Sequence, residues 1–301
     1  MGEGKSFKSG FVAIVGRPNV GKSTLMNRLL GQKLSIVSPR PQTTRTRILG
    51  IKNLPEAQVI FLDTPGIRKS GGYFNKVMVK AAMNTLQEAD LILWMVDAAD
   101  PLSPDDKLIL EALGGVKSPI LLAINKVDVV EKDKLLPAID RLQPLLPFVE
   151  IVPISATKGD NVERLESLLI HYLPEGQALF PLDQVTDQPE RFIIAELIRE
   201  KVFQLVYQEV PYAVAVEVEQ ITPRKDRELT DVEATIYVEK ESQKGIIIGR
   251  GGAMLKKIGE QARREIEMLL GTQVFLRLWV KVRPDWQKDD EALKRFGYLQ
   301  Q

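Results

Sequence analysis

The sequence predicts an α/β protein made of two domains, and three observations indicate this. The chain has 301 residues, which is long for one compact core and ordinary for two domains. Between residues 11 and 173, short apolar runs recur between longer amphipathic segments. After residue 190, the apolar residues follow helical spacing and then strict alternation. We therefore expect a mostly parallel sheet first and an α+β domain second.

The first domain is expected to contain buried strands at five apolar runs. These are FVAIV (11–15), QVIFL (58–62), LILWMV (91–96), ILLAI (120–124) and EIVPI (150–154). Apolar runs that do not alternate suit parallel strands buried on both faces, so helices should cover both sides of the sheet. Ligands of such sheets bind at the carboxyl ends of the strands.

A change of composition separates the two domains. The stretch from Pro174 to Pro189 contains three prolines and no clear period, which is typical of a linker. We place the first domain at residues 1–175, the linker at 176–189 and the second domain at 190–301.

The second domain is expected to begin with a helix and to end with a strand. The predicted order is a helix at 190–209, strands at 212–220 and 231–239, two helices joined by a glycine turn within 245–271, and a strand at 273–282. A charged tail containing Trp286 follows, and its role is not apparent from the sequence.

Composition excludes several classes of function. With no cysteine and one histidine, the chain has no disulfide, no thiolate metal site and no Ser-His catalysis. No apolar run approaches the roughly 20 residues that span a bilayer, so we expect a cytoplasmic protein. The formal net charge of +1 says nothing about partners.

The octapeptide GRPNVGKS follows the first predicted strand and opens a predicted helix. This is the G-x-x-x-x-G-K-S pattern in the setting that a phosphate-binding loop requires. Its glycines let backbone N–H groups surround phosphate oxygens, Lys22 supplies a cation, and Ser23 offers its hydroxyl to Mg²⁺. An ordinary glycine turn is the alternative. The predicted contacts are Gly16, Asn19, Val20, Gly21, Lys22, Ser23 and Thr24.

Two further motifs indicate guanine as the base. NKVD follows the strand ILLAI, and a fixed carboxylate such as Asp128 accepts the two adjacent donors of guanine, which adenine lacks. We expect the stem of Lys126 to cover the base and Asn125 to tie the loop to its neighbours. Ser155 and Ala156 follow the next strand, where a backbone N–H near Ala156 is expected to donate to the guanine carbonyl. Either motif alone also suits an ordinary loop.

The tetrapeptide DTPG follows the strand QVIFL. We predict that Asp63 holds the Mg²⁺ shell and that the Gly66 N–H reaches the terminal phosphate. The irregular stretch 32–47 is interpreted as the first switch loop, with Thr44 as the preferred Mg²⁺ ligand and Thr43 as the fallback. A strand leading into ILGI is the alternative for these threonines. Lys22, Thr44 and Gly66 are the predicted catalytic residues.

The glycine turn of the second domain indicates RNA binding. Glycines at a helix N-terminus let a sugar-phosphate backbone approach closely. Residues 246–283 contain eight Lys or Arg against three Glu, a balance of +5. The flanking isoleucines are expected to line an apolar groove for bases, and a helix-turn-helix packed at its glycines is the alternative. The predicted contacts are Ile248, Gly249, Arg250, Gly251, Gly252, Lys256 and Lys257.

These motifs together closely resemble the Era family, bacterial GTPases with a C-terminal KH domain. The resemblance rests on GRPNVGKS, QTTRTR, DTPG, NKVD, SATKG and IIIGRGG and covers nearly the whole chain. It implies a P-loop GTPase domain followed by a type II KH domain. The implied partners are GTP and GDP, the 3′ end of the small-subunit rRNA and the 30S subunit, whose maturation the family assists. It also implies peripheral contact with the inner face of the membrane, and no DNA partner is expected.

Ile67 stands where many GTPases place a water-orienting glutamine. The resemblance implies that an apolar residue here is compatible with hydrolysis, so another group must act on the water. We hypothesise that the Asn19 side-chain oxygen helps to hold K⁺ beside the phosphates, the alternative being that Asn19 only shapes the loop.

The predicted function is therefore a slow GTPase switch whose RNA affinity depends on the nucleotide. A GTP-binding RNA scaffold with negligible turnover is the main alternative. A metabolic ATPase or kinase would leave NKVD and IIIGRGG unexplained.

Overall fold

The computed structural model describes residues 6–68, 72–225 and 227–299. The chain divides into two compact units, with the boundary between Asp187 and Gln188. None of the helices within these ranges combines the length and the apolar character that a membrane span requires.

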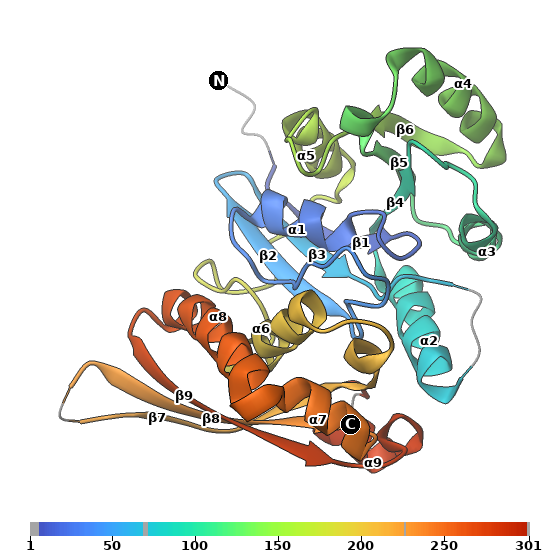
Figure 1. Ribbon diagram of the computed structural model, residues 1–301. Coiled ribbons are helices and arrows are strands. Elements are labelled where there is room, and N and C mark those ends of the chain that lie inside the picture. The colour runs from blue at the N-terminus through green and yellow to red at the C-terminus, as the bar shows by residue number, and fades with distance from the viewer. Residues whose placement is uncertain (1–5, 69–71, 226, 300–301) are drawn as a thin grey trace. The chain divides into compact units, whose positions relative to one another are not determined.

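The first unit is built on a six-stranded sheet with the order β2-β3-β1-β4-β5-β6 (Figure 1). The five predicted strands are present, and all their pairings are parallel, as expected. The sixth, β2, begins at the ILGI run, where the sequence analysis gave a strand only as an alternative; Thr43 and Thr44 precede it, and it is antiparallel to β3 at the edge of the sheet. The bounds are β1 Lys8–Val15, β2 Ile48–Leu54, β3 Ala57–Asp63, β4 Leu91–Asp97, β5 Ile120–Asn125 and β6 Phe148–Pro153.

Helices cover both faces of this sheet. One face packs in a core with residues of α2, α3 and α4 and includes Trp94, which is fully buried. The helices α1 and α5 contact the strands from the other side. The helices are α1 Lys22–Leu30, α2 Tyr73–Glu88, α3 Pro104–Leu113, α4 Lys132–Leu142 and α5 Val162–Tyr172, with short 3₁₀ turns at Val127–Val129 and Gln143–Leu145.

The segment 176–187, which we expected to be a linker, is ordered along the edge of the first sheet. The N–H of Ile51 donates to the carbonyl of Val185 at 2.9 Å, and Asn53 Nδ2 donates to Leu182 at 2.8 Å. The buried Gln58 side chain also bonds the backbone of this segment. These bonds satisfy the outer edge of β2, so the segment belongs to the first unit.

The second unit has the predicted order of elements. Its three strands have the order β7-β8-β9, with β7 antiparallel and β9 parallel to β8. The helices α6, α7 and α8 cover one face of this sheet (Figure 1). The bounds are α6 Glu190–Leu205, β7 Ala215–Pro223, β8 Leu229–Val238, α7 Glu241–Ile248, α8 Ala253–Leu270, β9 Gln273–Val282 and α9 Asp290–Arg295, with 3₁₀ turns at Val210–Ala213, Arg250–Gly252 and Trp286–Lys288.

The charged tail completes the core of the second unit. Trp286 is fully buried, and its indole N–H donates to the carbonyl of Ala213 at 2.9 Å. The rings of Phe296 and Tyr298 lie 5.5 and 5.9 Å from that of Trp286. The tail is therefore a structural part of this unit.

Replacing Trp286 by alanine should destabilise the second unit by about 3–5 kcal/mol, because a large buried ring and its hydrogen bond are lost. The matched control is Trp279→Ala, because Trp279 on β9 is 40% exposed, and it should cost about 1 kcal/mol or less. Urea unfolding followed by circular dichroism measures both, and amide hydrogen exchange locates the loss. Equal effects of the two substitutions would contradict the structural role of the tail.

Candidate functional site

The loop between β1 and α1 lines a cavity of about 470 Å³ at the carboxyl ends of the strands. Gly21 has a φ of 103°, and a Cβ there would lie 2.3 Å from Asn125 Nδ2, so only glycine fits. The predicted residues that line the cavity are Asn19, Gly21, Lys22, Ser23, Thr24, Thr43, Thr44, Gly66, Asn125, Lys126 and Asp128. Gly16 and Val20 stabilise the loop through their backbone. The carbonyl of Gly16 accepts from Lys22 Nζ, and the carbonyl of Val20 accepts from Asn125 Nδ2.

Lys22 is a buried cation held by neutral groups. Its side chain is 6% exposed, and Nζ donates to the carbonyls of Gly16 and Arg17, each at 3.0 Å. Burial lowers the pKa of Lys22 to about 8, opposed by the charges of Asp63 and Asp106. The direct hydrogen-bond partners of the ammonium are neutral carbonyls, so a bound phosphate would add a charged partner to it.

The three predicted Mg²⁺ ligands lie together. Ser23 Oγ donates to Asp63 Oδ2 at 2.6 Å, and the hydroxyls of Ser23 and Thr44 are 2.9 Å apart. Thr43, the fallback ligand, donates instead to the carbonyl of Arg40 at 2.8 Å. The arrangement favours Thr44.

The surroundings of the Asp63 carboxylate suit a bound cation. Its side chain is fully buried, and burial raises its pKa, opposed by Lys22 and by hydrogen bonds from Ser23, Ser35 and Thr44. Within the described residues, its Oδ1 has no hydrogen-bond partner. A buried carboxylate oxygen without a donor, next to two hydroxyls, fits a hard cation such as Mg²⁺. Ser35, which donates to Oδ2 at 2.8 Å, was missed by the sequence analysis because no motif surrounds it.

The base side of the cavity is organised by Asn125. Its Nδ2 donates to the carbonyl of Val20 at 2.7 Å, and its Oδ1 accepts from the N–H of Ala156 at 2.9 Å. The predicted tie between loops is therefore present. Asp128 is exposed and lines the cavity, as a base-reading carboxylate requires.

The loop after β6 differs from the expectation in one detail. Ala156 is buried, and its N–H is donated to Asn125, whereas Thr157 lines the cavity. Ser155 is also buried and closes the loop by accepting from the N–H of Lys158 at 3.0 Å. Because the N–H groups of Ala156 and Lys158 already have acceptors, an N–H of this loop reaches a bound base only if the backbone near Thr157 keeps its orientation.

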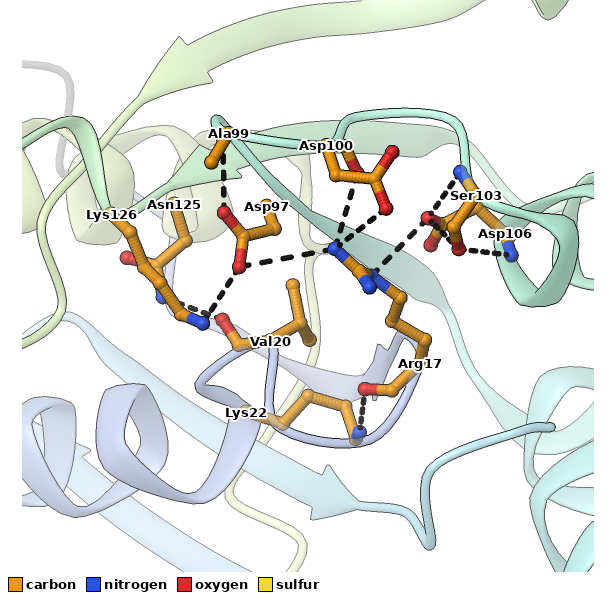
Figure 2. Close-up of polar contacts among 10 residues, drawn as sticks. All are labelled: Arg17, Val20, Lys22, Asp97, Ala99, Asp100, Ser103, Asp106, Asn125 and Lys126. Carbon is orange, nitrogen blue, oxygen red and sulfur yellow. Dashed lines mark hydrogen bonds and ion pairs between the residues drawn. The ribbon is translucent and has the colours of Figure 1, made fainter. Parts of the chain in front are cut away.

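A charged network, which no motif indicated, joins the phosphate loop to the base side (Figure 2). Arg17 lies 3.4 Å from Asp106, 3.5 Å from Asp100 and 3.9 Å from Asp97. Asp97, at the end of β4, also accepts from Lys126 Nζ at 2.7 Å. Lys126 is thereby oriented by a carboxylate that the sequence analysis did not single out.

Ile67 does not face the cavity. Its side chain is 1% exposed and packs in the core beneath the sheet. The neighbouring Gly66 lines the cavity, and a Cβ at Gly66 would lie 2.6 Å from the backbone of Pro18. The close approach explains the glycine, and the burial of Ile67 excludes it from any contact with water at the phosphates.

The glycine turn of the second unit is open on its outer side. Gly249, Gly251 and Gly252 have φ values of 71°, 57° and 81°, and a Cβ at Gly251 or Gly252 would meet nothing within 4 Å. Arg250, Lys256 and Lys257 are exposed around the N-terminus of α8, and Ile248 is half-buried. Ile247, in contrast, is fully buried in the core, so only part of the isoleucine run is at the surface.

Comparisons with known proteins agree with this geometry. Residues 11–126 match the family of 50S ribosome-binding GTPases, and residues 209–287 match the KH domain family. The chain is 54% identical to GTPase Era of Geobacter metallireducens over 292 residues, covering 97% of this chain and 98% of that protein. It is 53% identical to GTPase Era of Geotalea uraniireducens over 294 residues, covering 98% and 99%.

Two solved structures are similar over nearly the whole chain. One is Era in complex with MgGDPNP and nucleotides 1506–1542 of 16S ribosomal RNA, and the other is a variant of Aquifex aeolicus Era bound to GDP and AlF4⁻. Each has a TM-score of 0.94 and 46% identity and covers 98% of this chain and 100% of the other. The chain belongs to the Era family, GTPases that carry a C-terminal KH domain.

Proposed function

We propose that the protein is a GTP-hydrolysing switch that binds the single-stranded 3′ end of small-subunit rRNA and assists assembly of the 30S subunit. One observation carries this proposal: a buried lysine, a Ser-Thr-Asp cluster and an exposed aspartate line or adjoin one cavity. The solved relative that holds MgGDPNP and 16S rRNA nucleotides supports the same pairing of ligands here.

On this proposal, each group in the cavity has one task. Lys22 and the loop amides bind the phosphates, and Ser23, Thr44 and Asp63 hold Mg²⁺. Bound Mg²⁺ supplies positive charge that stabilises the phosphates during transfer. Gly66 presents its N–H to the terminal phosphate, and Asp128 reads the guanine donors. Loss of the terminal phosphate on hydrolysis releases Thr44 and Gly66. The first switch loop, which contains Thr44, and the loop after β3, which contains Gly66, then change conformation.

The switch must also change the affinity for RNA. A nucleotide alters RNA binding only if the two nucleotide states bind RNA with different free energies. The glycine turn, with Arg250, Lys256 and Lys257 exposed around it, is the RNA contact that we propose. We place the protein in the cytoplasm with its ribosomal partner; peripheral contact with a membrane stays an expectation from the resemblance.

Because Ile67 is buried, another group must act on the attacking water. Asn19 lies in the phosphate loop with a φ of 63°, and its Nδ2 donates to the carbonyl of Pro39 in the first switch loop at 2.7 Å. We propose that Asn19 Oδ1 helps to hold K⁺ near the phosphates. Such an ion would stabilise the charge that develops in phosphoryl transfer, as an arginine finger does in other GTPases.

Asp128→Asn should weaken GTP binding by about 100-fold or more and favour xanthosine nucleotides, because the amide no longer accepts both guanine donors. Binding is measured by isothermal titration calorimetry with GDP and XDP. The control is Asp140→Asn on α4, an exposed aspartate outside the cavity, which should bind GDP normally. An unchanged preference for guanine would contradict the role of Asp128.

Gly251→Asp should weaken binding of a single-stranded RNA copying the 3′ end of small-subunit rRNA by about tenfold or more, because it places a negative charge where phosphate must approach. Aspartate tolerates the local φ of 57°, and its Cβ meets open space, so the fold should persist. Gly251→Asn has nearly the same shape without the charge and should lose less affinity. GTP binding should be unchanged in both, and its loss in either would indicate misfolding.

GTP hydrolysis should be faster in KCl than in NaCl and should rise further with this RNA. Asn19→Gly should abolish the advantage of K⁺ while keeping GDP binding, since glycine adopts the positive φ of Asn19 without strain. Multiple-turnover phosphate release measures this. Equal rates in both salts would remove the K⁺ proposal, and tight GTP binding without turnover in any condition would favour the scaffold.

A further inference from the structure

Arg28 connects the helix that follows the phosphate loop to the loop that follows β6. It lies in the last turn of α1, and its Nε donates to the carbonyl of Ala156 at 2.6 Å, although the two residues are 128 positions apart. Its Nη2 donates to the carbonyl of Thr157. One guanidinium therefore holds two consecutive carbonyl groups, a task that suits its rigid fork of donors.

The orientation of these carbonyls determines where the N–H groups of the loop point. In a trans peptide the C=O and the N–H of the next residue lie in one plane and point in opposite directions. When Arg28 holds the carbonyls of Ala156 and Thr157, the N–H groups of Thr157 and Lys158 must point away from the guanidinium. The N–H of Lys158 donates to Ser155, and Thr157 lines the nucleotide cavity.

The loop is restrained from two sides. Asn125 accepts from the N–H of Ala156 on the inner side, and Arg28 binds the carbonyls on the outer side. Gly159 has a φ of 99°, and a Cβ there would lie 2.8 Å from Arg28 Nη1, so the chain follows the guanidinium closely. Bonds within the loop, from the N–H groups of Lys158 and Gly159 to Ser155, close it on itself, whereas Arg28 and Asn125 tie it to other parts of the chain.

The same helix also carries the phosphate-binding lysine. Lys22 opens α1 and Arg28 lies six residues later, about 9 Å along the axis. A rigid helix of this length keeps a fixed spacing between the groups that bind the phosphates and the loop that meets the base.

We propose that Arg28 is a positioning residue for guanine specificity: it holds the loop from Ser155 to Lys158 so that the N–H of Thr157 meets the carbonyl oxygen O6 of guanine. This inference rests on the proposed guanine nucleotide site. Arg28 itself touches no nucleotide in this role, and its effect is transmitted through the two carbonyls that it binds.

The test compares three nucleotides with three variants. GDP has both the O6 acceptor and the exocyclic amine, 6-thio-GDP replaces O6 by the weak acceptor sulfur, and IDP lacks the amine that Asp128 reads. Arg28→Met removes the guanidinium, and Arg28→Lys keeps the positive charge with a single donor nitrogen in place of the guanidinium fork. The control is Arg164→Met, at an exposed arginine on α5. Dissociation constants are measured by calorimetry, and thermal unfolding of each variant checks the fold.

The expected result is a selective loss of recognition at O6. Arg28→Met should weaken GDP binding by about tenfold, the size of one good hydrogen bond, and should change 6-thio-GDP binding by less than about twofold. The ratio between GDP and IDP should stay the same, because Asp128 is not disturbed. Arg28→Lys should be intermediate, and Arg164→Met should resemble the wild type.

Two outcomes would overturn the proposal. Equal weakening of GDP and 6-thio-GDP would mean that Arg28 only stabilises the fold. Unchanged GDP binding would mean that the bonds to Asn125 and within the loop suffice to hold it. Failure of the proposed guanine site looks different, because then the wild type itself would not prefer GDP to IDP.

Discussion

The nucleotide site depends on two opposite charges that are buried and that the protein surrounds with neutral groups. Lys22 donates to two carbonyls, and Asp63 Oδ2 accepts from hydroxyls. The other carboxylate oxygen, Asp63 Oδ1, has no partner among the described residues. Burial disfavours both charges, as the shifts of their pKa values show. Such an arrangement costs folding free energy, which a polyanion and a hard cation would offset on binding.

The parallel sheet makes this arrangement possible, because the carboxyl ends of its strands meet at one edge. Asp63 ends β3, Asp97 ends β4 and Asn125 ends β5. Each side chain reaches a loop that belongs to another part of the chain, and Asn125 touches two of them. The site is therefore a set of loops held in register by hydrogen bonds from strand ends and from α1.

The phosphate loop and the turn before α8 both contain glycines with positive φ, but the missing side chain has a different consequence in each. At Gly21 a side chain would collide with Asn125, whereas at Gly251 it would meet open space. The first glycine is required by packing inside the unit, and the second leaves the N-terminus of α8 accessible from outside. Accessibility, together with the exposed basic residues nearby, distinguishes a surface for a polyanion from an ordinary helix connection.

Local periodicity and local loop chemistry were enough to predict the fold class, five strands of the first sheet, the order of the second unit and the motifs that we propose for the phosphates and the base. Only the folded chain shows that β2 pairs at the edge, that Thr44 rather than Thr43 lies beside Ser23, and that Ile67 is core. It also brought Arg28 to Ala156 and Trp286 to Ala213. These contacts join residues distant in the chain, and no local pattern specifies which distant partner a side chain meets.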